Sequence, residues 1–137
     1  MNTIRIHTDG GARGNPGPAA IGVVIKNENE RVLGKISRKI GEATNNVAEY
    51  SAVVAALEWV KNSCQLSVVS CQFFLDSTLV VNQLNGLFKV KNGNLRNLLF
   101  QIRQLEQETG GVISYTYIPR EKNHEADTLV NQALDNG

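Results

Sequence analysis

The sequence predicts an α/β fold in which a five-stranded mixed sheet, an antiparallel meander plus parallel strands, is flanked by helices. Three observations support this prediction. Apolar and polar residues alternate near the start, apolar residues recur at helical spacing from residue 45, and strand-like and helix-like stretches then take turns to the end. A meander followed by β–α units produces a mixed sheet with helices packed on its faces.

The first third of the sequence predicts three strands with short connections. Apolar and polar residues alternate from residue 4 to Asp9, which predicts a strand that ends at Asp9. The stretch 10–18 is rich in glycine and proline and favours a turn. Residues 20–27 and 31–40 predict two further strands. Such short links indicate an antiparallel meander.

The remainder predicts four helices and two more strands. Apolar residues at helical spacing begin after Thr44 or Asn45, either of which is suited to be the N-cap. A later run rich in Val, Phe and Leu is typical of a buried strand. The predicted elements are, in order, a helix over 45–62, a strand within 66–77, a short helix over 77–86, a helix with an apolar stripe over 95–105, a strand over 112–119 and a helix over 124–134.

Length and composition indicate one domain that spans residues 1–137. A chain of 137 residues with 42% apolar residues can bury a core without disulfides or a structural metal. Fourteen basic and thirteen acidic side chains give a net charge of +1, so the total charge does not identify a nucleic-acid binder. A near-neutral total can still combine a basic face with an acidic pocket.

The sequence indicates a cytoplasmic protein. Cys64 and Cys71 match no disulfide framework or zinc pattern and are expected to be small apolar residues, although their spacing would also allow a local bridge in an oxidising compartment. The first residues lack the pattern of a secretory signal. No apolar run approaches the roughly 20 residues of a membrane helix, so we expect no membrane partner. We also expect a monomer.

Four carboxylates stand out from the other acids by their positions. Asp9 and Asp76 end strands, where a carboxylate is costly unless something binds it. Glu49 lies near the start of the first helix and Asp127 one turn into the last. Packing both helices at the same end of the sheet would bring the four acids together. Each acid taken alone is equally well explained as a helix cap or a solvated loop charge.

Four acids in one place repel each other, and no cluster of lysines in the sequence obviously neutralises them. Hard divalent cations with oxygen ligands resolve this conflict. Mg²⁺ suits the role because it keeps several waters and joins carboxylates to phosphate oxygens. Two such ions would give the two-metal arrangement used for in-line displacement at phosphate. We therefore expect two Mg²⁺ ions per site with substrate, with Mn²⁺ as an alternative ion.

Four blocks in this order resemble type 1 ribonuclease H and span nearly the whole chain: TDGGARGNPGP at 8–18, ATNNVAEYSAVVAALE at 43–58, FFLDSTLVVNQLNG at 73–86 and IPREKNHEADTLVNQA at 118–133. The resemblance implies the ribonuclease H-like fold and endonucleolytic cleavage of the RNA strand of RNA–DNA hybrids, leaving 5′-phosphate and 3′-hydroxyl ends. It implies that the catalytic, metal-binding acids are Asp9, Glu49, Asp76 and Asp127.

The resemblance also implies substrate contacts in loops beside these acids. The backbone at the two glycines would approach the RNA strand, the three asparagines would read 2′-hydroxyls, bases or backbone in the minor groove, and the threonine would grip a phosphate of the DNA strand. Taken alone, these residues are better explained as turn residues and helix caps, and it is their position next to the acids that favours substrate contacts. They are Gly10, Gly11, Asn15, Thr44, Asn45 and Asn46.

The sequence departs from many bacterial members in two places. The basic insertion after the helix that follows the third acid is missing, so the chain resembles the compact form found in archaeal and some bacterial members. The charge of the missing insertion is expected to be partly replaced by Lys89, Lys91, Arg96 and Arg103. For Arg96 and Arg103, a solvated helix face is an equally good explanation.

The loop before the fourth acid is short and lacks the histidine that many members carry there. We do not assign that role to His124, which lies at the helix start, and we interpret His7 as structural. Arg120 is the better candidate for a functional loop residue, in contact with a scissile-side phosphate or the leaving group. Two other functions remain open: a related nuclease that also cuts double-stranded RNA, and a non-catalytic nucleic-acid binding module of the same fold.

Overall fold

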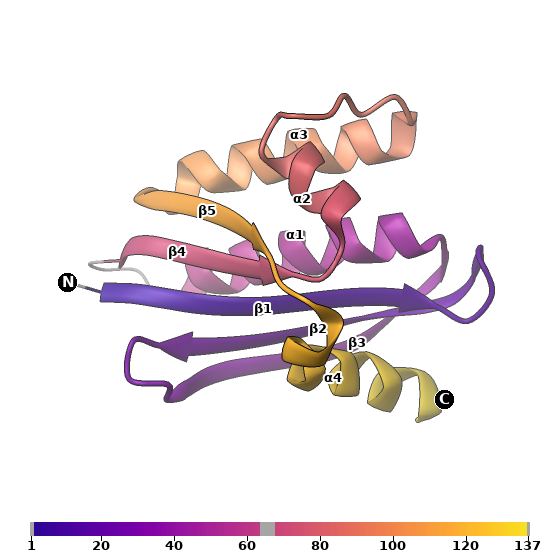
Figure 1. The fold of residues 1–137 in the computed structure, drawn as a ribbon, viewed down its shortest axis with the longest axis horizontal. Helices are drawn as coiled ribbons and strands as arrows, with labels where there is room; N and C mark the ends of the chain where they lie inside the picture. The colour runs from indigo at the N-terminus through magenta and orange to yellow at the C-terminus, as the bar shows by residue number, and fades with distance from the viewer. Residues whose placement is uncertain (1, 64–67, 137) are drawn as a thin grey trace.

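A computed structural model describes residues 2–63 and 68–136 and shows the expected mixed sheet (Figure 1). Its five strands lie in the order β3-β2-β1-β4-β5. The β1–β2 and β2–β3 pairs are antiparallel, whereas β1–β4 and β4–β5 are parallel. The prediction of a meander followed by parallel strands is therefore confirmed. The strands are β1 (Asn2–Ala12), β2 (Gly17–Asn27), β3 (Val32–Ala43), β4 (Val68–Leu75) and β5 (Val112–Tyr117).

Helices cover both faces of the sheet (Figure 1). α1 and α3 lie on one face over the larger apolar core, and α4 packs on the opposite face against β2 and β3 through a smaller cluster around Val130. In the described part of the chain, no helix is long and apolar enough to cross a membrane. The helices are α1 (Asn45–Ser63), α2 (Thr78–Leu84), α3 (Gly93–Thr109) and α4 (His124–Asp135), with a 3-10 turn, η1 (Arg120–Lys122), before α4.

The predicted end of the first strand at Asp9 is wrong. β1 continues through Gly10 and Gly11 to Ala12, paired with β2. Gly10 serves close packing, because a Cβ atom built on it would lie 2.3 Å from the carbonyl carbon of Ala48 in α1, whereas a Cβ atom on Gly11 would make an ordinary contact of 3.7 Å with Val130. The turn is confined to 13–16, and the Arg13 N–H closes it by donating to the Pro18 carbonyl over 2.8 Å.

The predicted N-cap of the first long helix is confirmed at the position of Thr44. Its Oγ1 accepts a hydrogen bond of 3.2 Å from the backbone N–H of Val47, which satisfies a donor of the first turn. Cys71 is buried in β4, as expected for a small apolar residue. The expectation for Cys64, and with it the local bridge, lies outside the described residues.

Candidate active site

Three of the four selected acids meet where the parallel strands β1 and β4 run side by side. Asp9 lies within β1, Asp76 directly follows β4, and Glu49 is in the second turn of α1. One carboxylate oxygen from each lies within 4.8 Å of those of the other two. The parallel pairing of β1 with β4 ends at His7 and Phe74, two residues before Asp9 and Asp76, and this places both acids at one edge of the paired strands.

Close backbone packing places Glu49 against the strand. The Gly10 N–H donates a hydrogen bond of 2.7 Å to Glu49 Oε1. This bond requires α1 to approach β1 closely, and the missing Cβ of Gly10 permits that approach. Glu49 is 6% exposed and Asp9 is 5% exposed, so both carboxylates sit at the bottom of the site.

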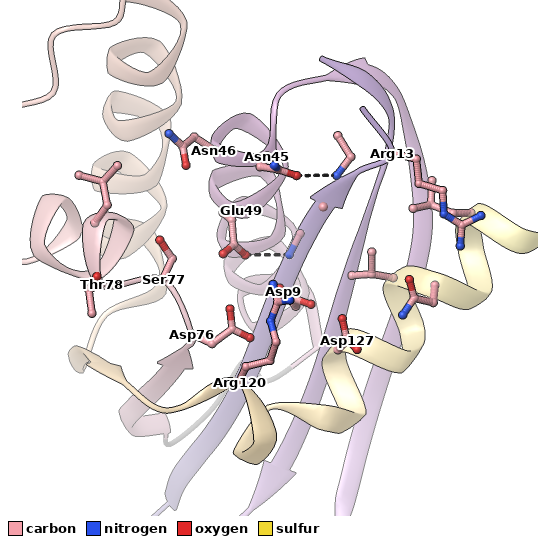
Figure 2. Close-up of a pocket in the computed structure, with 17 residues that line it drawn as sticks. Asp9, Arg13, Asn45, Asn46, Glu49, Asp76, Ser77, Thr78, Arg120 and Asp127 are labelled. Atoms are coloured by element: carbon pink, nitrogen blue, oxygen red, sulfur yellow. Dashed lines mark hydrogen bonds between the residues drawn. The ribbon is translucent and has the colours of Figure 1, made fainter. Parts of the chain in front are cut away.

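Asp127 reaches the same site from the opposite face of the sheet. It lies in the first turn of α4 and lines the cleft on the α4 side, near Asp9 (Figure 2). It is not one of the three acids whose oxygens lie within 4.8 Å of one another. Its charge nevertheless raises the pKa of Asp9, so the two groups are electrostatically linked.

Burial and mutual repulsion disfavour the charged forms of the buried acids. Burial, then the charges of Asp76 and Asp127, raise the pKa of Asp9 to about 7, against the opposing effects of the Gly10 N–H and Arg120. Burial, then the charges of Asp9 and Asp76, raise the pKa of Glu49 well above its usual value. Carboxylates in this situation gain stability from a proton or from a bound cation.

The donor set fits a hard divalent cation. Asp9, Glu49 and Asp76 offer carboxylate oxygens that are close enough to share an ion, and carboxylate oxygen is the ligand that Mg²⁺ prefers. A divalent charge would also offset the repulsion that raises the pKa of Asp9 and Glu49. The site is therefore able to hold metal through these three acids.

The acids lie in an open cleft of about 460 Å³ between β1, α1, η1 and α4 (Figure 2). Arg13 and Arg120 are the two basic residues that line it, and Arg120 extends toward Asp9 (Figure 2). Of the predicted substrate-contact residues, the cleft lining contains Gly10, Gly11, Asn45 and Asn46.

Asn15 and Thr44 do not line the cleft but hold the segments beside it. Asn15 Oδ1 accepts a hydrogen bond of 3.0 Å from the Asn45 N–H, and Asn45 Oδ1 accepts one of 2.8 Å from the Ala12 N–H. Thr44 caps α1. These bonds tie the β1–β2 turn to the start of α1, so the asparagines have at least a structural task.

Sequence reasoning missed several cleft residues. Arg13 lies in a stretch whose glycines and prolines predict a turn, and no local pattern marks it as a cleft residue. Asn131 follows Asp127 by four residues, so helical spacing could have placed it on the same face. The missed polar residues of the lining are Arg13, Ser77, Thr78 and Asn131.

The contacts of His7, Arg103 and His124 show that none of these three residues belongs to the cleft lining. His7 stacks on Phe74 with ring centroids 5.0 Å apart, and burial followed by the charge of Lys26 lowers its pKa, which fits a structural residue. Arg103 donates to the Leu84 carbonyl over 2.6 Å and to Glu106, so its charge is used within the fold. His124 is exposed and is absent from the cleft lining.

Residues 7–133 match the protein family described as Reverse transcriptase-like. Ribonuclease H of Methylococcus capsulatus is 31% identical over 146 residues, covering 97% of this chain and 90% of the relative. A bifunctional protein of Mycobacterium tuberculosis is 40% identical over 131 residues, but this chain, 95% covered, spans only 35% of its length.

Solved structures agree with these sequence relatives. LC11-RNase H1, isolated from compost by a metagenomic approach, is 46% identical, with a TM-score of 0.91 and coverage of 99% of this chain and 98% of that chain. The same enzyme in complex with an RNA/DNA hybrid is 45% identical, with a TM-score of 0.92 and 97% coverage of both chains. With its sheet order, its acid cluster and these relatives, the chain belongs to the ribonuclease H family.

Proposed function

We propose that this chain is a single-domain endonuclease that hydrolyses the RNA strand of RNA–DNA hybrids, leaving 5′-phosphate and 3′-hydroxyl ends. The observation that carries the proposal is the meeting of Asp9, Glu49 and Asp76 within 4.8 Å at the bottom of an open cleft. A protein that only binds nucleic acid gains nothing from buried negative charge facing phosphate. The hybrid complex of LC11-RNase H1 supports the choice of substrate.

Asp9, Glu49, Asp76 and Asp127 hold two Mg²⁺ ions, or Mn²⁺, when substrate is bound. The ions supply an activated water and charge stabilisation of the leaving oxygen. The chain itself contributes orientation: the Gly10 N–H holds Glu49 in place, and the fixed backbone of β1 holds Asp9. A carboxylate already held in position needs no reorganisation during the reaction.

The rims of the cleft hold the hybrid. Arg120 contacts a phosphate beside the scissile bond or the leaving group, and Arg13 contacts another phosphate. The RNA strand passes over the backbone of the two glycines, and amide side chains read the 2′-hydroxyls, which distinguish RNA from DNA. Thr44 contacts a phosphate of the DNA strand. Besides the two arginines, the substrate-contact residues are Gly10, Gly11, Asn15, Thr44, Asn45 and Asn46.

Labelled RNA–DNA hybrid, double-stranded RNA and double-stranded DNA, each incubated with Mg²⁺, Mn²⁺ or a chelator, test the proposal. We expect cleavage of the RNA strand of the hybrid with either metal and none with chelator. Product ends are identified by their susceptibility to phosphatase and ligase. Equal cleavage of double-stranded RNA would favour the broader nuclease. Binding without cleavage under all conditions would favour a non-catalytic module.

We further propose that the protein acts as a monomer in the cytoplasm. Light scattering coupled to gel filtration measures the mass in solution, for which the expectation is the 15.0 kDa of one chain. Localisation of a fluorescent fusion in cells of the source tests the compartment. A stable dimer or a secreted product would overturn the respective part.

A further inference from the structure

One buried amide connects three elements of the cleft. Asn123 lies between η1 and α4 and is 1% exposed. Its Nδ2 group donates to the Thr8 carbonyl in β1 over 2.9 Å and to Asp76 Oδ2 over 3.0 Å. Both hydrogens of the amide are therefore used, one on the strand that carries Asp9 and one on an acid of the cluster.

The orientation of this amide is determined by its surroundings. Thr8 O and Asp76 Oδ2 are both acceptors, so only the amino side of Asn123 can face them. Asn123 Oδ1 is left buried without a partner in the described part of the chain, an arrangement that is normally unfavourable. The fold thus tolerates an unsatisfied carbonyl oxygen in order to keep two donors directed at these acceptors.

The backbone of Asn123 holds two other cleft residues. Its N–H donates to the Arg120 carbonyl over 2.9 Å and closes η1. Its carbonyl accepts from the Asp127 N–H over 3.2 Å and starts α4. A single residue therefore relates the Asp76 carboxylate to the positions of Arg120 and Asp127, all of which line the cleft (Figure 2).

We propose that Asn123 is a positioning residue: it fixes the rotation of the Asp76 carboxylate for metal binding and sets η1 and α4 around that carboxylate. Glu49 is oriented by a backbone N–H, whereas Asp76 follows the end of its strand and is oriented by a side chain. Partners that orient metal-binding carboxylates typically change metal affinity or activity 10–100-fold when they are removed. The inference rests on the proposed function because it takes the acids to be metal ligands.

Asn123→Ala and Asn123→Leu test this role. Leucine keeps most of the buried volume and also removes the unsatisfied Oδ1, so it protects folding if the alanine variant unfolds. We expect both to bind Mn²⁺ at least about tenfold more weakly in calorimetric titrations, and to lower kcat for the hybrid at least about tenfold while KM changes by less than about twofold. Circular dichroism checks that each variant is folded.

Ser37→Ala is the matched control, because Ser37 Oγ donates to the Leu129 carbonyl over 2.6 Å and so ties α4 to β3 without a hydrogen bond to any of the four acids. It should leave Mn²⁺ affinity and kcat unchanged. Folded Asn123 variants with normal Mn²⁺ binding, or failure of both to fold, would overturn the positioning role. A wild-type protein that binds Mn²⁺ but cuts no hybrid would refute the proposed function alone, and the Mn²⁺ titrations would still decide the role of Asn123.

Discussion

Different interactions hold the floor and the rim of the cleft in place. The floor is formed by Asp9, Glu49 and Asp76, and the rim carries Arg13, Arg120 and Asp127. The floor is fixed by packing: β1 is paired on both sides, and α1 rests on Gly10. The rim belongs to exposed turns and to α4, where contacts with solvent compete. The acid geometry is therefore a property of the fold, whereas the positions of the rim charges depend on exposed contacts that are weaker.

The ion pair between Arg13 and Asp135 shows how weakly the rim is held. The two groups lie 2.6 Å apart, but their side chains are 51% and 63% exposed. Exposed pairs of this kind contribute about 0–1 kcal/mol to stability and are screened by salt. Arg13 can therefore leave Asp135 and bind a phosphate at little cost in free energy. Glu49, in contrast, is buried and is held by the Gly10 N–H.

The largest expected effect comes from removing one charge from the floor. Asp9→Asn should lower cleavage of the hybrid about 10³-fold or more, because the loss of a metal ligand removes several kcal/mol of stabilisation of the transition state. Folding should be intact or slightly improved, since repulsion is relieved. Single-turnover cleavage and urea unfolding measure the two quantities. Cleavage at the wild-type rate would refute the catalytic assignment.

Gly10→Ala should disrupt the floor through packing alone. The added Cβ would lie 2.3 Å from the Ala48 carbonyl carbon and 2.5 Å from the Glu49 nitrogen, so α1 must move and Glu49 moves with it. Because overpacking costs about 1–3 kcal/mol and backbone yields less easily than side chains, we expect a loss near the top of that range in urea unfolding. Cleavage should also fall.

Gly93→Ala is the control for this substitution. A Cβ at Gly93 meets nothing within 4 Å, and the residue lies in the first turn of α3. Alanine there should leave stability unchanged or raise it by up to about 1 kcal/mol. Equal destabilisation by both substitutions would mean that close packing of α1 on β1 is not what requires glycine at position 10.

The stability of the metal-free protein should fall as pH rises from about 4 to about 7. Asp9 has its pKa raised to about 7 from 3.8, so the folded state holds this proton in a range where the unfolded chain has lost it. The corresponding stabilisation is complete below about pH 4 and is lost by about pH 7. Urea unfolding in chelator at pH 5 and pH 8 measures the fall.

The difference between wild type and Asp9→Asn measures the contribution of Asp9 together with its effect on Glu49, whose pKa the charge of Asp9 also raises. We expect the wild type to lose more stability than the variant between the two pH values, and Mg²⁺ to restore the wild type at pH 8. An identical pH dependence in both proteins would contradict the effect of burial and charge repulsion on the pKa of Asp9.

The sequence predicted the floor well because its determinants are local. The alternating pattern before Asp9, the apolar run before Asp76 and the helix start before Glu49 can be read from neighbouring residues. The parallel pairing of β1 with β4 ends at His7 and Phe74, so it brings Asp9 and Asp76 together even though β1 itself continues to Ala12. The turn predicted from Gly10 onward is wrong at Gly10 because glycine serves both turns and close approaches, and only the packing of α1 on β1 decides between them. Tertiary packing carries information that no local pattern contains.

Asn123 shows the same limit more sharply. Its side-chain partners are 115 and 47 residues away in the sequence, so nothing near Asn123 signals its contacts. Arg13 was hidden for a related reason, since a charged residue in a turn is ordinarily solvated. In contrast, Asn131 repeats the position of Asp127 one helical turn later and was open to prediction.

The smallest expected effect tests the rim. We combine Arg13→Gln with Asp9→Asn, so that the hybrid is bound without being cut. Arg13→Gln should then weaken hybrid binding, and the slope of log affinity against log salt concentration should become shallower by about 0.9, the value for one lost phosphate contact. Asp135→Asn should act in the opposite direction at low salt, because it frees Arg13 from its competing partner. Fluorescence anisotropy between 50 and 200 mM salt, a range over which phosphate contacts change affinity by about 10³–10⁵ when six to ten are made, resolves both changes. An unchanged slope in Arg13→Gln would show that Arg13 does not contact the hybrid. That result would not affect the assignment of the acids, because Arg13 pairs with Asp135 and its loss alters no contact of Asp9 or Glu49.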